Sequence, residues 1–212
     1  GKSTLVNVVC GVLKPTAGDV IFEGRSMAGQ TPSTRLRNGI ARTFQNIRLF
    51  GGLTVWQNLW VARNSTEDIR SQSILRRWLG SGTALKKEIE TVLEFSNLAD
   101  KADVLASNLA FGEQRRLELA RAVAAKPRLL LLDEPAAGMN QAEVAELEQR
   151  IRSLREQGIT ILLVEHVMQL VMGVTDRIAV LNFGSKIAEG SPNDIQENTA
   201  VQEAYLGHSD QG

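Results

Sequence analysis

LLLLDEP, residues 129–135, is the stretch on which the fold depends. Four consecutive leucines predict a strand that is buried on both faces, as in a parallel sheet. Such a strand brings Asp133 and Glu134 to its carboxyl end, where ligands bind in open α/β sheets. Asp133 is suited to bind Mg²⁺ through water, and Glu134 is suited to polarise an attacking water. A purely structural junction with a capping aspartate would not explain two adjacent carboxylates after so apolar a strand.

The chain opens with GKST, residues 1–4, which has the form of the end of a phosphate-binding loop. In such a loop, backbone N–H groups at a helix N-terminus hold phosphate, the lysine reaches the β- and γ-phosphates, and a hydroxyl binds Mg²⁺. Lys2 and Ser3 would have these roles, with Gly1 and Thr4 beside them. A bare G-K-[ST] arises by chance in roughly one chain in ten of this length. Together with LLLLDEP about 130 residues later, it predicts nucleotide binding.

The spacing of apolar residues predicts helices alternating with strands through much of the chain. Helices are expected at 3–11, 54–63, 85–98, 112–125 and 142–157, and strands at 19–23, 39–44, 129–132, 160–164, 177–181 and 186–188. Residues 64–84 are polar and are interpreted as a variable helical insertion, and 207–212 as a frayed end. This alternation predicts an α/β fold with a largely parallel sheet.

Composition narrows the possible classes of protein. The 212 residues carry 24 basic and 24 acidic side chains, so the protein has no basic field to hold nucleic acid. The single cysteine excludes a disulfide framework and a zinc site built on cysteines. The apolar runs are of strand length and fall short of the ~18 residues that span a bilayer. Work at a membrane would therefore go through a partner.

The longest motif is NLAFGEQRRLELARAVAAKPRLLLLDEPAAGMN, residues 108–140. It resembles the nucleotide-binding subunit of an ABC transporter, with LAFGE (109–113) at the place of that family's Leu-Ser-Gly-Gly-Gln signature. Gly112 opens a helix whose free N–H groups can bind a phosphate. In the family this phosphate belongs to an ATP held by the opposite subunit. The resemblance therefore implies that Ala110, Phe111, Gly112 and Glu113 contact ATP across a dimer.

Two further matches follow the family's order. Gln45, in ARTFQNIRLF, stands at the Q-loop, which the resemblance implies touches Mg²⁺ and couples to the membrane subunit. His166, in ILLVEHVM, stands at the switch histidine, which would contact the γ-phosphate and act with the catalytic Glu134. A lone histidine after a strand is more often structural, but the other motifs in the right order favour function. The implied fold is a P-loop NTPase with a RecA-like sheet, as one domain over 1–212 with a helical subdomain at about 54–125.

Several longer stretches of the sequence indicate a subfamily of ABC transporter subunits. KPTAGDVIFEG, DEPAAGMN and VEHVMQLVMGVTDRIAVLNFGSKIAEGSPNDI resemble the ATP-binding subunits of branched-chain amino-acid importers. The lipopolysaccharide-export ATPase is a relative with similar motifs and stays an alternative. The importer resemblance implies a second ABC ATPase subunit, transmembrane permease subunits and, indirectly, a solute-binding protein. It also implies a peripheral position on the cytoplasmic face of the inner membrane.

Some residues depart from the family's usual pattern. Ala110 replaces the signature serine, and Asn140 replaces the D-loop aspartate; both replacements resemble the importer subgroup. Gln141 stands where proline is common in the family. Val167 stands where an aspartate often follows the switch histidine.

Two other classes of protein fit the sequence less well. A DNA-maintenance ATPase would carry a long coiled coil or a zinc module between Q-loop and signature, whereas 63 residues without heptads or cysteine separate Gln45 from Leu109. A non-catalytic docking module would not need to keep Lys2, Asp133, Glu134 and His166.

The family carries a glycine-rich stretch, a central strand and an antiparallel sheet before the position of Gly1. We therefore expect the 212 residues to be an incomplete copy that lacks roughly 30–40 residues, with unpaired edges beside the strand at 129–132. These residues alone should bind MgATP poorly and aggregate, because most of the phosphate nest is absent. Calorimetric titration with MgATP and light scattering would test this expectation. Tight, Mg²⁺-dependent binding by a monodisperse sample would contradict it.

Overall fold

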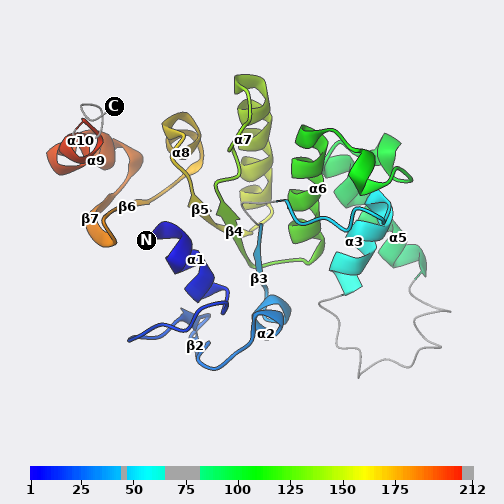
Figure 1. Cartoon of the computed structure of the whole chain (residues 1–212), viewed down its shortest axis with the longest axis horizontal. Helices are drawn as coiled ribbons and strands as arrows, with labels where there is room; N and C mark the ends of the chain where they lie inside the picture. Colours follow the sequence, from blue (N-terminus) through cyan, green and yellow to red (C-terminus); the bar gives the residue numbers. More distant parts are fainter. Residues whose placement is uncertain (44–46, 65–81, 207–212) are drawn as a thin grey trace.

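The computed structural model of the protein describes residues 1–43, 47–64 and 82–206 (Figure 1). Its strands are β1 (Ile21–Phe22), β2 (Arg25–Ser26), β3 (Ile40–Arg42), β4 (Leu129–Asp133), β5 (Thr160–Val164), β6 (Ile178–Asn182) and β7 (Ser185–Gly190). Its α-helices are α1 (Lys2–Val9), α2 (Pro32–Arg37), α3 (Val55–Asn64), α5 (Gly82–Phe95), α6 (Phe111–Ala124), α7 (Gln141–Glu156), α8 (Met168–Val174), α9 (Pro192–Gln196) and α10 (Thr199–Leu206), and short 3₁₀ turns cover Ala99–Lys101 and Ala106–Asn108. The alternation of strands and helices confirms the predicted α/β class.

The strand that contains LLLLDEP is the middle strand of a three-stranded parallel sheet in the order β3-β4-β5. Leu130 pairs with Ala41 of β3 and with Ile161 of β5. The side chains of the three leucines at 130–132 are fully buried, which confirms the predicted two-sided burial. The prediction of unpaired edges beside this strand was wrong, because β4 is hydrogen-bonded to a neighbouring strand on each side.

The strands expected at 177–181 and 186–188 form an antiparallel hairpin. Among the described residues, β6 pairs with β7 alone, in antiparallel orientation. The physical reason is the turn between them: Phe183 and Gly184 both have positive φ, 46° and 87°, as two-residue hairpin turns require. The strand predicted at 19–23 is shortened in the same way, because Glu23 and Gly24 turn the chain from β1 into β2.

The predicted helices are confirmed by α1, α3, α5, α6 and α7, with ends that local chemistry explains. Asn140 begins α7: its side-chain oxygen accepts a hydrogen bond from the Glu143 N–H at 3.0 Å, and its own N–H donates one to the Glu143 carboxylate at 2.9 Å. Gly158, at φ 84°, follows the end of that helix. Of the insertion predicted at 64–84, residues 65–81 lie outside the described part, as does the end expected to fray.

The sheet is covered on both faces, and alternation along β4 decides which leucine faces which layer. Leu130 and Leu132 belong to a cluster with α7 and α8, whereas Leu131 packs with Val6 of α1 on the other face. Figure 1 shows this arrangement, with α7 and α8 above the sheet and α1 below it. The helix that follows GKST is thereby pressed against the strand that carries DEP.

Helix α6 belongs to two cores. Leu119 and Ala122 pack into the cluster with the sheet, whereas Leu117, Ala120 and Ala124 pack into a second cluster with α3 and α5. Figure 1 shows α3 and α5 at one end of the molecule, beyond α6, and α9 and α10 at the opposite end. The segment that carries LAFGE is therefore attached to the sheet through one buried face of α6.

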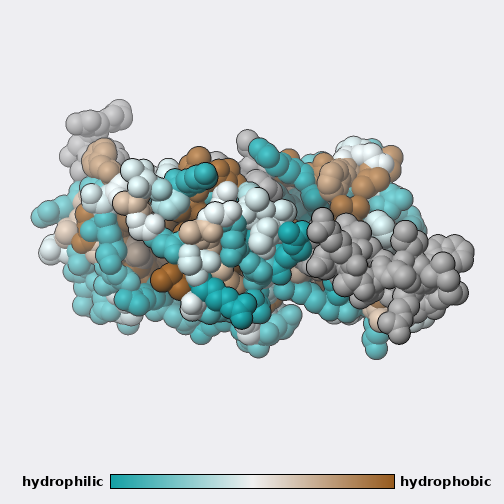
Figure 2. Space-filling model, turned by 90° about the horizontal axis from the view of Figure 1, so that it is seen from below, coloured by the Kyte–Doolittle hydropathy of each residue, from teal (hydrophilic) through white to brown (hydrophobic). Residues whose placement is uncertain are grey.

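The surface seen from below is mainly hydrophilic, with hydrophobic residues in scattered patches (Figure 2). Within residues 1–43, 47–64 and 82–206, none of the helices is both long and apolar enough to cross a membrane.

We predict that Leu132→Ala lowers the free energy of unfolding by about 2–5 kcal/mol, because it leaves a cavity in a fully buried layer. Leu105→Ala is the matched control: that leucine is 41% exposed, so its truncation should change the free energy by no more than about 0.5 kcal/mol. Urea denaturation of the two variants measures the difference. Equal losses would contradict the central position of β4.

Candidate functional site

The site is built at the carboxyl end of β4, where Asp133 is 4% exposed. Arg42, the last residue of β3, places its Nη2 3.7 Å from Asp133 Oδ2. Its Nη1 donates a hydrogen bond of 2.7 Å to Oδ1 of Asn7 on α1. Arg42 thus links α1, the helix that begins within GKST, to the aspartate of LLLLDEP.

The environment of Asp133 disfavours its charged form. Burial raises the pKa of this carboxyl, the neighbouring Glu134 raises it further, and Arg42 acts in the opposite direction. Among the residues that the structure describes, Asp133 Oδ1 has no hydrogen-bond partner. A buried carboxylate oxygen without a donor fits an acceptor for a cation or for a cation-bound water, because an unsatisfied buried acceptor costs free energy otherwise.

Glu134 has a positive φ of 49°, which is uncommon for a residue other than glycine. Its N–H donates a hydrogen bond of 2.8 Å to the Val164 carbonyl, so the ladder between β4 and β5 extends one residue past Asp133. The chain then turns sharply into the loop 135–140. Backbone strain of this kind costs about 1–3 kcal/mol and concentrates at functional sites.

His166 lies just after β5, on the loop beside the one that carries Glu134. Its side chain is 61% exposed, while the side chain of Glu165 before it is fully buried. Asp133 pairs with Val164 across the sheet, so the two loops leave adjacent strands at the same level. The structure therefore brings Asp133, Glu134 and His166 to one edge of the sheet.

Sequence reasoning gave no role to Glu165. Its carboxylate accepts hydrogen bonds from the backbone N–H of Ala136 at 3.1 Å and of His166 at 2.8 Å. The signal was an acidic residue directly after a buried strand, the same signal that pointed to Asp133 and Glu134.

Gly1, Lys2, Ser3 and Thr4 are exposed at the start of α1. Gly1 is the N-cap residue, and no side chain caps the helix. The first-turn N–H groups are those that lack partners within a helix, so this end is suited to bind phosphate. A Cβ on Gly1 would lie 3.1 Å from Gly184 Cα, which places this helix end beside the β6–β7 turn.

The signature-like segment forms the N-terminus of α6, with Ala110 as its N-cap and Phe111 exposed. Glu113 accepts a hydrogen bond of 2.9 Å from the Ala110 N–H and forms an ion pair with Lys101. The hydrogen bonds from Lys101 and from the Ala110 backbone lower the pKa of the Glu113 carboxyl. This carboxylate is therefore committed to its own helix end, and it is the backbone N–H of the first turn that is suited to face a phosphate.

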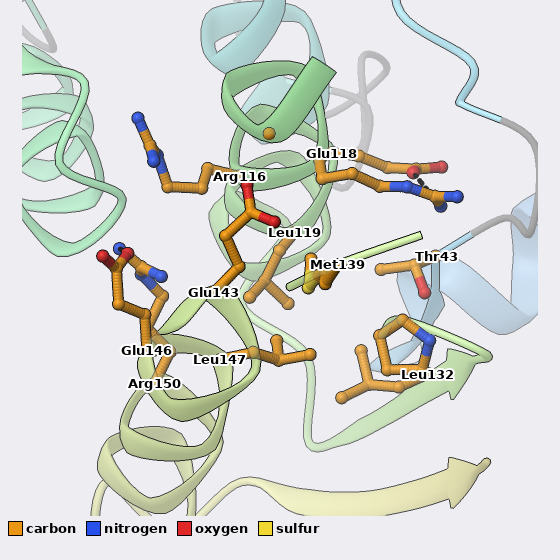
Figure 3. A pocket seen from close by; sticks show the side chains of 13 residues that line it. Thr43, Arg116, Glu118, Leu119, Leu132, Met139, Glu143, Glu146, Leu147 and Arg150 are labelled. Atoms are coloured by element: carbon orange, nitrogen blue, oxygen red, sulfur yellow. Dashed lines mark hydrogen bonds and ion pairs between the residues drawn. The ribbon is translucent and has the colours of Figure 1, made fainter. Parts of the chain in front are cut away.

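The signature-like segment lies against the loop after β4. A Cβ on Gly112 would lie 2.8 Å from Oε1 of Glu143, and one on Gly138 would lie 3.7 Å from the Phe111 ring. Figure 3 shows the pocket beside this contact, with Glu143 and Leu147 from α7 on one side and Leu119 from α6 on the other. Its volume of about 40 Å³ holds a few water molecules and is far too small for a nucleotide.

The structure does not bring all the predicted residues together. Figure 1 shows α1 and α6 on opposite sides of the strands β4 and β3. The sheet thus separates the helix that contains Lys2 and Ser3 from the helix that contains Gly112. Gln45 falls within 44–46 and lies outside the described residues.

The chain is similar to known proteins along its whole length. Residues 1–137 match the ABC transporter family, and residues 185–211 match the branched-chain amino acid ATP-binding cassette transporter family. The high-affinity branched-chain amino acid transport ATP-binding protein LivG of Salmonella typhimurium is 42% identical over 99% of this chain and 84% of its own length. The corresponding protein BraF of Pseudomonas aeruginosa is 39% identical over the same shares.

Solved structures agree with the sequence comparison. The ADP conformation of an ATP-binding cassette of an ABC transporter superposes with a TM-score of 0.81 at 30% identity, over 98% of this chain and 84% of that one. A nucleotide-free cassette superposes with a TM-score of 0.79 at 29% identity, over 97% and 83%.

We predict that Asp133→Asn is more stable than the wild type at pH 7 in the absence of ligands. The pKa of Asp133 is higher in the folded than in the unfolded protein, so folding loses stability as pH rises from about 3.9 through the folded value. Urea denaturation from pH 4 to pH 7 should show the difference between variant and wild type growing with pH. The exposed Asp103→Asn is the control, and a variant less stable than wild type at pH 7 would contradict the prediction.

Proposed function

The chain belongs to the ABC transporter family of ATP-hydrolysing subunits, and on that basis we propose that it powers the uptake of branched-chain amino acids. The observation that carries the choice of solute is the similarity to the LivG and BraF proteins, which extends over 99% of the chain. The match at residues 185–211 favours this importer over the lipopolysaccharide-export alternative.

The residues at the edge of the sheet fit MgATP. We assign the phosphates to the backbone N–H groups and to Lys2 at the start of α1, and Mg²⁺ to Ser3, Gln45 and Asp133. Asp133 suits this role because it is buried and one of its oxygens is unsatisfied within the described part of the chain. When bound, Mg²⁺ neutralises charge that develops on the transferred phosphoryl group.

Glu134 is the proposed general base. It follows the buried strand directly, so its carboxylate would lie near the γ-phosphate of a bound ATP. There it would accept a proton from the attacking water. His166, on the adjacent loop, would contact the γ-phosphate. The strained backbone at Glu134 supports a functional position, since tertiary contacts hold it there.

The separation of α1 from α6 supports a site shared by two subunits. The N-terminus of α6 in one subunit, from Ala110 to Glu113, would face the phosphates held by α1 of the other. Two such sites arise at once if the subunits are related by a two-fold or pseudo-two-fold axis. The partner is proposed to be a sister ATPase, as the importer resemblance suggests.

The helices α3, α5 and α6 share a core of their own, which supports a helical subdomain at about 54–125. We propose that this part and the Gln45 loop transmit the closure of the dimer to transmembrane permease subunits. The subunit would then lie peripherally on the cytoplasmic face of the inner membrane, with a solute-binding protein delivering the amino acid on the other side.

In the ATPase as its source produces it, Glu134→Gln should keep MgATP binding and lose hydrolysis, because a carboxamide contacts the water but does not accept its proton. We expect kcat to fall at least about 100-fold with the Kd for MgATP changed less than about threefold. In proteoliposomes that contain the assembled transporter, leucine uptake should stop as well. Glu156→Gln, on an exposed glutamate at the end of α7, is the matched control.

Two outcomes would contradict these assignments separately. Unchanged hydrolysis in Glu134→Gln would remove Glu134 from the role of base. In the assembled transporter, leucine, isoleucine or valine with the binding protein should stimulate ATP hydrolysis by the wild type. If none of the three does, the proposed solute is refuted.

A further inference from the structure

We propose that Glu165 is a positioning residue, whose buried carboxylate holds the loop of Glu134 in register with the loop of His166. The proposal rests on the catalytic roles given above to Glu134 and His166. It adds a group that touches neither nucleotide nor water and that acts through the two residues beside it.

The geometry shows a side chain shared between two loops. The Glu165 side chain is fully buried, and each of its two oxygens accepts hydrogen bonds from a different loop. Oε2 accepts a hydrogen bond of 3.1 Å from the N–H of Ala136, two residues after Glu134. Oε1 accepts hydrogen bonds of 2.8 Å from the N–H of His166 and 3.3 Å from that of Val167.

These bonds continue the sheet where its backbone ladder ends. A ladder bond joins the Glu134 N–H to the Val164 carbonyl, one residue past the final strand pair of Asp133 with Val164. Beyond it the strands diverge into loops, and the Glu165 carboxylate bridges them. The Nδ1 atom of His166 lies 3.3 Å from Oε1, so the imidazole itself is also next to this carboxylate. The Glu165 side chain therefore influences the positions of both Glu134, the proposed base, and His166.

The chemistry explains why a carboxylate stands here. A carboxylate is an acceptor at both oxygens, and three N–H groups converge on it. A glutamine of the same shape offers one accepting oxygen, and its NH₂ group would face an N–H donor on whichever loop it met. It can therefore hold one loop and not both. Since misplacement of a reacting group by 1 Å can cost about 100-fold in rate, loss of one anchor should be visible in kcat.

The test is a double-mutant cycle in the ATPase as its source produces it, with Glu165→Gln, His166→Ala and the combination. We expect Glu165→Gln to lower kcat about 10- to 100-fold, while the Kd for MgATP changes less than about threefold. Because Glu165 acts partly through His166 and partly through the loop of Glu134, the loss of kcat in the double variant should be smaller than the product of the two single losses. Rates are expressed per bound ATP, so that a partly unfolded preparation still yields a kcat.

Two further variants separate positioning from general stability. Glu165→Asp keeps two accepting oxygens on a shorter side chain, and its kcat should lie between those of the wild type and Glu165→Gln. Asp194→Asn makes the same carboxylate-to-amide change at the capped start of α9, where Asp194 accepts a hydrogen bond of 2.8 Å from the Ser191 N–H. This control should leave kcat unchanged.

Wild-type kcat in Glu165→Gln would overturn the proposal, as would losses that multiply in the double variant, which indicate independent effects. Failure of the proposed function looks different: in that case the wild type itself does not hydrolyse ATP, or Glu134→Gln hydrolyses it normally. A wild type that is active, a Glu134→Gln that is inactive and an unaffected Glu165→Gln would refute only the positioning role.

Discussion

The rest of the structure depends on the burial of β4 from Leu130 to Asp133. Its backbone is paired on both sides, by β3 and β5, and its leucines alternate between a layer of α7 and α8 and a layer that contains α1. A strand satisfied in this way has only one place for polar side chains, which is its carboxyl end. Asp133 and Glu134 occupy that end, and the strands and helices around them bring α1 and the loop of His166 to the same edge.

Burial at this edge has a cost that is consistent with function. Asp133 is charged less readily than an exposed aspartate, and one of its oxygens lacks a partner within the described residues. Glu134 adds a strained backbone conformation. These features lower the stability of the empty protein, and a bound cation and phosphate would satisfy them. The Glu165 side chain is itself fully buried, so its carboxylate depends on the N–H groups of the two loops for hydrogen bonds.

The position of α6 gives the molecule a second constraint. One of its faces packs on the sheet and the other on α3 and α5, so its N-terminus is held firmly but on the far side of the sheet from α1. The helices α1 and α6, whose first turns are proposed to bind phosphate, therefore pack on opposite faces of the sheet. This is the structural basis for the proposal that two subunits complete each other's sites.

The sequence by itself determined features that depend on near neighbours: the leucine strand, the helices α1, α3, α5, α6 and α7, and the motifs at strand ends and helix starts. It did not predict α2, α8, α9 and α10. Periodicity and capping are local, so these could be predicted closely. Only the tertiary structure decided that β4 has neighbours on both sides, β3 and β5. The same holds for Arg42, which joins Asn7 to Asp133, and for Glu165, which joins two loops. Each of these is a contact between segments far apart in the chain, and a local pattern contains no information about which segments meet.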